Sequence, residues 1–126
     1  MRRGIVDVNA LDRLGVVCSI ASNNILNPFT PFGDCSLLRM ANLHANTLQL
    51  GSAADLSACF EMVSEKAARI MNCADYGLAP GKPADLVVIA APDEAAAVAE
   101  VAAVLHVFKR GRPTVTRAPA TLHQQA

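Results

Sequence analysis

The sequence pattern changes near Gly77, and this change constrains the fold more than any other feature. Before Gly77, apolar residues recur with helical spacing, as in the leucine and alanine stripe over 37–48. After it, the apolar runs 84–90 and 104–111 are typical of strands. A chain of 126 residues has the size of one ordinary domain. The pattern therefore predicts an α/β fold built on one core, or on one piece of a larger core.

The first part of the chain predicts a helix, a strand and a loop. Apolar residues spaced by three predict a helix over 5–14 that ends at Gly15. The run 16–20, VVCSI, is too short for a helix and predicts a buried strand, with polar residues just past its end. Two prolines and a glycine in 27–33, NPFTPFG, predict an ordered loop.

Four further helices are predicted from their start signals. Asp34 is expected to cap the first, with Gly51 at its end, and the Ser52–Asp55 pair resembles a capping box for the second. The predicted helices cover residues 34–50, 52–63, 64–72 and 92–101. A turn at 111–113 should then lead into a last strand.

Composition excludes several classes of protein. The chain is 52% hydrophobic and 17% charged, with zero formal net charge, which predicts a packed domain rather than a disordered chain. Because Lys and Arg are scattered, neither nucleic acid nor a membrane surface is an expected partner. A signal peptide and an apolar run long enough to cross a membrane are both missing, so a cytoplasmic location is expected.

Cysteines and histidines do not form a recognisable metal motif. The four cysteines contain no C-x-x-C pair, and buried free thiols are the expected state. The three histidines, His44, His106 and His123, lack a metal-ligand spacing such as H-x-H. We therefore expect no metal or other cofactor in this chain.

Two segments near the C-terminus carry a family resemblance. YGLAPGKPADLVVI (76–89) and VFKRGRPTV (107–115) resemble the C-terminal signature of the amidohydrolase superfamily. RRGI (2–5) and LGVVCSIASNNILNPFTPFGD (14–34) resemble its cytosine deaminase branch. The resemblance covers the chain from Arg2 to about Thr116.

The resemblance implies a fold and its division into parts. It implies a C-terminal fragment of a metal-dependent hydrolase TIM barrel, with its last strand and helices, plus part of a small β-sandwich. Residues 1–75 would form the barrel part and 76–117 the β-sandwich portion, with 118–126 as a disordered tail.

The resemblance also implies the site. The family's strand leads into H-D-D-x-x-D-P-W-Y-P-x-G, and here 22–33 keeps the prolines and glycine but carries Asn at every acidic position. Asn23 stands at the position of the catalytic, metal-binding Asp, and an amide neither ionises nor accepts a proton near neutral pH. Asn24, Asn27 and Phe29 stand at substrate-binding positions for a planar heterocycle. Taken without the family, Ser and Asn after a strand are also ordinary turn formers.

The resemblance implies that the metal-binding histidines of the family would lie before residue 1. It also implies that full-length relatives bind a divalent metal, zinc or iron. We therefore expect a truncated or mis-started fragment of a hydrolase acting on non-peptide C–N bonds, inactive alone. Two alternatives stay open: a non-catalytic ligand- or protein-binding module, and part of a divergent hydrolase that uses Asn23 and Asn24 in place of acidic residues. The expected partners are the missing N-terminal barrel portion, or a second copy through self-association, and a small heterocyclic substrate in full-length relatives.

Overall fold

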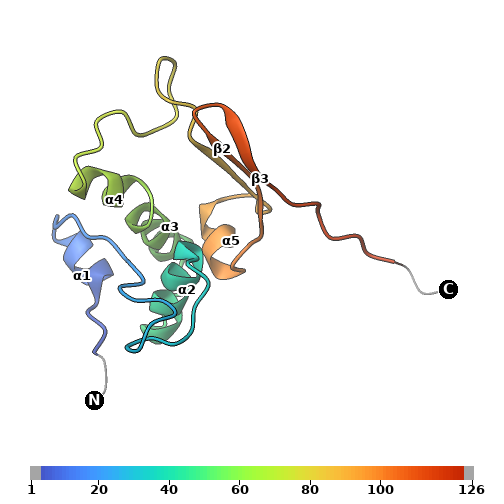
Figure 1. The fold of residues 1–126 in the computed structure, drawn as a ribbon. Coiled ribbons are helices and arrows are strands. Elements are labelled where there is room, and N and C mark those ends of the chain that lie inside the picture. The colour runs from blue at the N-terminus through green and yellow to red at the C-terminus, as the bar shows by residue number, and fades with distance from the viewer. Residues whose placement is uncertain (1–3, 124–126) are drawn as a thin grey trace.

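The computed structural model describes residues 4–123 as a helical body beside a small antiparallel sheet (Figure 1). The elements in chain order are α1 (Val8–Arg13), α2 (Leu37–Thr47), α3 (Ala53–Met62), α4 (Glu65–Ile70), β1 (Leu86–Ile89), α5 (Glu94–Ala99), β2 (Val104–Lys109) and β3 (Arg112–Thr116). The expected mixed α/β class is confirmed. None of the helices within 4–123 is long and apolar enough to span a membrane.

The core lies where α2, α3 and α5 meet. Ala41 and Ala45 from α2, Cys59 from α3 and Val98 from α5 are buried together, and their small side chains let the three helices approach closely. The Asn42 amide ties α2 to the end of α5, because its Nδ2 donates to the Val98 carbonyl at 2.9 Å. Since α5 lies between β1 and β2 in the chain, this contact also anchors the sheet to the helical body.

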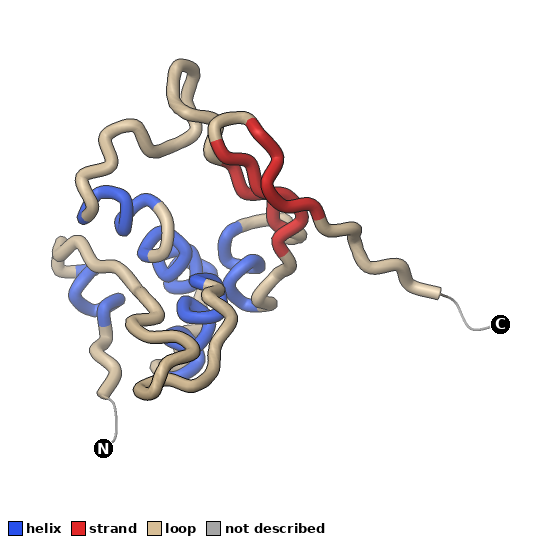
Figure 2. The backbone as a smooth tube through the Cα atoms, in the orientation of Figure 1, coloured by secondary structure: helices blue, strands red, loops and turns tan. Residues whose placement is uncertain are grey.

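The sheet, red in Figure 2, has the strand order β1-β2-β3, and both neighbouring pairs are antiparallel. Val107 of β2 lies opposite Val87 of β1 and Val115 of β3. The β2–β3 turn has positive φ at Arg110 (49°) and Gly111 (74°), as expected of a tight hairpin turn. The two predicted strand runs are thereby confirmed. The turn predicted at 111–113 lies at Arg110 and Gly111 instead, because Arg112 and Pro113 already pair with β2 as part of β3.

Ser36 is the N-cap of α2, so the predicted cap at Asp34 is wrong by two residues. The Ser36 hydroxyl accepts the Arg39 N–H at 3.2 Å, while Asp34 accepts the Ser36 N–H at 3.1 Å and pairs with the Arg39 guanidinium. The helix ends at Thr47 and not at Gly51. The predicted Ser52 cap of α3 is confirmed, since its hydroxyl accepts the Asp55 N–H at 3.1 Å.

The first helix is shorter than predicted and buries a different face. Only Val8–Arg13 is helical, and Leu14 of the predicted apolar face is 80% exposed. The buried residue of α1 is Asn9, whose Nδ2 donates to the Asp55 carbonyl of α3 at 3.2 Å. Polar contacts therefore contribute to joining α1 to the body.

Residues 16–20 have no regular secondary structure, so the predicted buried strand is wrong in this structure. Val16 and Val17 are 48% and 37% exposed, while Cys18 is buried. The Ile20 N–H donates to the Met62 carbonyl at 3.2 Å, at the end of α3. A strand requires a neighbouring strand to complete its backbone hydrogen bonds, and the described residues place no strand beside this segment.

After β3, residues 117–123 have no regular secondary structure and extend away from the body (Figure 1). Their side chains are exposed. The predicted tail 118–126 lies partly outside the described residues.

Candidate functional site

The candidate site is the loop 22–33, which lies between the segment 16–20 and α2. A tight turn and a second residue with positive φ shape its first half. The Asn24 N–H donates to the Ser22 carbonyl at 2.8 Å across Asn23, which has φ of 61°. Leu26 also has positive φ, at 49°. Asparagine tolerates such a conformation well and leucine poorly, so the loop holds a strained backbone at Leu26.

Asn27 organises the second half of the loop. Its Oδ1 accepts the backbone N–H groups of Phe29 and Thr30, both at 3.0 Å. Its backbone also pairs with Thr30 in both directions, at 3.0 and 3.1 Å. The predicted ordered loop is confirmed.

The structure joins two of the predicted site residues directly. The Nδ2 of Asn27 donates to the Oδ1 of Asn24 at 2.9 Å, and both residues are half-buried. Asn23 is exposed, and Phe29 is 79% exposed, so neither lies in an enclosed pocket within this structure. The loop therefore presents an amide pair with an aromatic ring nearby in the chain.

Two loop residues were not singled out from the sequence. The Thr30 hydroxyl is buried and makes no hydrogen bond in the described part of the chain. Gly33 has φ of 119°, and a Cβ there would lie 3.3 Å from Ile25. The sequence NPFTPFG marked both as loop residues, but only the three-dimensional packing shows that Gly33 lies close to the Ile25 side chain.

The Phe32–Asp34 end of the loop borders an open hollow beside α2. Phe32 and Gly33 line it from the loop, and Met40 and Leu43 line it from the helix. The Arg39–Asp34 ion pair, at 2.7 Å, lies on its rim and lowers the pKa of the Asp34 carboxyl through the hydrogen bond from Arg39. The lining of this hollow therefore combines apolar side chains with an ion pair.

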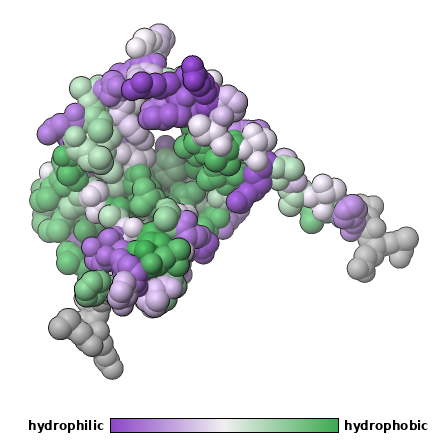
Figure 3. Space-filling view, viewed as in Figure 1, coloured by the Kyte–Doolittle hydropathy of each residue, from purple (hydrophilic) through white to green (hydrophobic). Residues whose placement is uncertain are grey.

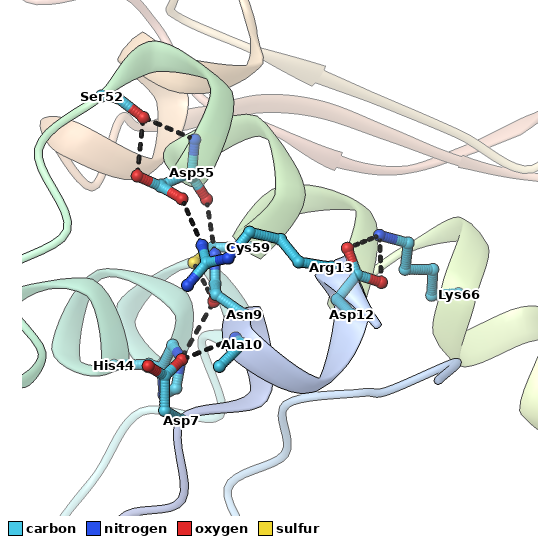
Figure 4. A network of polar contacts seen from close by, with 10 residues as sticks. All are labelled: Asp7, Asn9, Ala10, Asp12, Arg13, His44, Ser52, Asp55, Cys59 and Lys66. Atoms are coloured by element: carbon cyan, nitrogen blue, oxygen red, sulfur yellow. Dashed lines mark hydrogen bonds and ion pairs between the residues drawn. The ribbon is translucent and has the colours of Figure 1, made fainter. Parts of the chain in front are cut away.

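No histidine among the described residues makes a hydrogen bond to the loop amides. His44 is buried on α2, and its Nε2 lies 3.1 Å from the Asn9 Oδ1 (Figure 4). Burial lowers the pKa of His44, so the ring is neutral near pH 7. His106 packs against Phe108, and His123 lies exposed in the tail segment. Within residues 4–123 there is no group of three or more His, Cys, Asp or Glu side chains that could hold a metal ion.

Figure 4 shows a second polar cluster, where α1 meets α2, α3 and α4. Asn9 lies at its centre and also accepts a weak hydrogen bond from the Cys59 thiol at 3.5 Å. Burial raises the pKa of that thiol. Lys66 of α4 pairs with Asp12 at 2.7 Å and with Glu61 at 2.9 Å. Each of these groups is satisfied by a neighbour, so the cluster is a structural junction.

Comparisons with known proteins agree on one family. The Amidohydrolase family model matches residues 1–115. N-isopropylammelide isopropyl amidohydrolase from Pseudomonas sp. (strain ADP) is 32% identical over 99 residues, covering 78% of this chain and 25% of that protein.

Solved structures give the same result. 5-Methylcytosine deaminase from Klebsiella pneumoniae, liganded with 5-fluorocytosine, matches with a TM-score of 0.89 and 31% identity, over 98% of this chain and 30% of that one. N-isopropylammelide isopropylaminohydrolase from Burkholderia multivorans matches with a TM-score of 0.76 and 31% identity, over 84% and 27%. The chain thus spans 25% to 30% of the length of these relatives.

Proposed function

This chain belongs to the amidohydrolase family, in its cytosine deaminase-like branch, and on that premise we propose that it is the substrate-facing part of a hydrolase of C–N bonds. In this proposal the loop 22–33 binds a planar heterocycle. The observation that carries it is the Asn24–Asn27 amide pair, held in one geometry by the turn that Asn27 caps.

Amides suit such a ligand because its ring edge offers both hydrogen-bond donors and acceptors. A neutral amide matches these groups without requiring a charge on the ligand, and a phenyl ring such as that of Phe29 can cover a ring face. The Klebsiella pneumoniae deaminase holds 5-fluorocytosine, a ring of this kind. This similarity supports a nitrogen heterocycle as the substrate class.

The donor atoms of the loop do not fit a catalytic metal. Zinc and iron in hydrolytic sites favour histidine, cysteine and carboxylate ligands, whereas Asn23, Asn24 and Asn27 offer neutral amide oxygens. An amide at position 23 also cannot take a proton from water as a general base would. We therefore propose that this chain, taken alone, does not hydrolyse its ligand.

The exposed apolar surface supports the proposal that another protein segment covers it. Leu14, Val16 and Val17 are exposed next to one another in the chain, and apolar residues spread over much of the face shown in Figure 3. The proposed occupant is the remaining part of an amidohydrolase barrel, because this chain covers 30% of the deaminase that it matches with a TM-score of 0.89. That part would supply the metal and the catalytic base.

Activity and ligand binding can be measured separately on the purified chain. With cytosine and added zinc or iron we expect no ammonia release. With 5-fluorocytosine we expect NMR shifts confined to the loop, and these shifts should weaken in Asn24→Ala but not in Asn46→Ala, which removes an exposed amide on α2. Tight binding of one metal with ammonia release would contradict the inactivity. Absence of loop shifts at millimolar ligand would contradict heterocycle binding.

The partner is tested by co-expression with the Klebsiella pneumoniae deaminase lacking its matching segment. We expect the two pieces to co-purify, and Val17→Asp to weaken this association. The control Val87→Asp changes a valine that is 56% exposed on the sheet. A monodisperse monomer that captures nothing would favour a stand-alone binding module, and a homo-oligomer would favour self-association.

A further inference from the structure

The orientation of the Asn27 side chain is fixed by chemistry. One atom of its terminal amide lies 3.0 Å from the backbone nitrogens of both Phe29 and Thr30. Both nitrogens donate, so this atom must be the oxygen. A reversed amide would place its NH2 group against two N–H groups and lose both hydrogen bonds. The nitrogen of Asn27 therefore faces Asn24.

This orientation determines that of Asn24 in turn. The Asn27 nitrogen lies 2.9 Å from one terminal atom of Asn24, and because the nitrogen donates, that atom must be an acceptor oxygen. The Asn24 NH2 group is consequently turned away from Asn27. It makes no hydrogen bond to any residue that the structure describes, although Asn24 is half-buried. The Oδ1 of Asn24 thus already accepts a hydrogen bond, whereas its NH2 group remains available to donate one.

We propose that Asn27 is a positioning residue that sets the hydrogen-bonding polarity of the site. Through Asn27, Asn24 presents donors to a ligand, so the ligand edge that meets it must carry an acceptor, such as a carbonyl oxygen or an unprotonated ring nitrogen. This inference rests on the proposed function of the loop and narrows its substrate class. Asn27 acts through Asn24 and needs no contact with the ligand.

The variant Asn27→Asp separates this role from a merely structural one. A carboxylate keeps an oxygen acceptor for the Phe29 and Thr30 N–H groups, so the turn is retained. It lacks the donor that holds the Asn24 oxygen. The Asn24 amide should then rotate, donate to the new carboxylate and present its oxygen outward. The expected effect is that Asn24 presents a hydrogen-bond acceptor to the ligand instead of a donor, while the backbone of the loop keeps its conformation.

The first test needs no ligand. In the 15N-labelled chain, we expect the Asn24 side-chain NH2 protons to exchange freely with water, and to exchange about ten-fold more slowly in Asn27→Asp because of a charge-assisted hydrogen bond. Asn46→Asp is the matched control, since Asn46 donates to Asn42 at 2.9 Å in a separate amide pair on α2. Unchanged Asn24 side-chain signals, with the Phe29 and Thr30 backbone signals in place, would overturn the inference.

The second test uses two ring probes of opposite polarity. 1-Methyl-2-pyridone offers a carbonyl acceptor and no donor, whereas aniline offers an amine donor. We expect the parent chain to bind the pyridone about five-fold more tightly than aniline, and Asn27→Asp to reverse the order, from the usual contribution of one hydrogen bond. Equal affinities in the parent would overturn the inference. Binding of neither probe counts against the proposed function, while the ligand-free spectra decide the inference independently.

Discussion

Asn9 should contribute more to stability than any exposed asparagine of this chain. It is 2% exposed and makes three contacts: its nitrogen donates to the Asp55 carbonyl, and its oxygen accepts from His44 and from Cys59. Because the oxygen of Asn9 is the acceptor, the Nε2 of the neutral His44 ring carries the proton. Replacing Asn9 with alanine leaves that buried N–H with no acceptor.

The expected loss follows from these contacts. The Asn9 hydrogen bonds contribute about 1 kcal/mol each, and an orphaned buried donor costs about 1–3 kcal/mol. The thiol contact at 3.5 Å is weak and adds little. We therefore expect Asn9→Ala to lower the free energy of unfolding by about 2–4 kcal/mol, which for a chain of this size lowers Tm by about 10 °C.

The assay is urea denaturation followed by far-UV circular dichroism, because the chain has no tryptophan. The control is Asn46→Ala, which removes an exposed amide from α2 and should change the free energy of unfolding by less than about 0.5 kcal/mol. If the two variants unfold at the same urea concentration with equal slopes, the contacts of Asn9 do not hold α1 on the helical body.

Two further predictions concern pH and the loop. Burial lowers the pKa of His44 below its ordinary 6.5, so the unfolded chain binds the proton more readily and stability should fall as pH drops from 7 to 5. His44→Gln should reduce this fall in the free energy of unfolding between pH 7 and 5. If the parent chain and the variant lose the same stability over this range, His44 is not the group responsible. Gly33→Ala, at φ of 119°, should cost about 1–3 kcal/mol in urea denaturation. The control Gly51→Ala places its Cβ in open space and should lower the free energy of unfolding by less than about 0.5 kcal/mol. Equal losses in the two variants would show that the backbone at Gly33 does not require glycine.

Local signals predicted the elements that local interactions determine. The Ser52 cap and the hairpin at Gly111 each depend on residues a few positions apart, and both were predicted. The cap of α2 was misplaced because Asp34 and Ser36 are both good capping residues, and only the backbone geometry selects Ser36. The segment 16–20 was predicted as a strand from its composition, which cannot supply the neighbouring strand that pairing requires.

Long-range packing explains the other errors. The cysteines were expected to be buried, but Cys35 and Cys73 are exposed because they lie in the connections before α2 and after α4. The residues of the candidate site were identified by resemblance. Their pairing was not predicted, because the contact between Asn24 and Asn27 depends on the positive φ angles at Asn23 and Leu26. No periodicity in the sequence indicates those angles.

The amide pair also explains why this loop can keep its shape without charge. Asn24 and Asn27 meet donor to acceptor at 2.9 Å, whereas two carboxylates at that distance would repel unless they shared a proton or a cation. Asn23 differs from both, because it is exposed and makes no side-chain hydrogen bond to the described residues. Aspartate tolerates a positive φ nearly as well as asparagine. Asn23→Asp should therefore leave the loop intact, so that in a longer protein containing this chain its effect on turnover reports chemistry and not folding. If Asn23→Asp restores metal-dependent turnover, the asparagine reflects loss of an ancestral catalytic function. If the substitution abolishes an existing activity, Asn23 is a specialised residue of a divergent hydrolase.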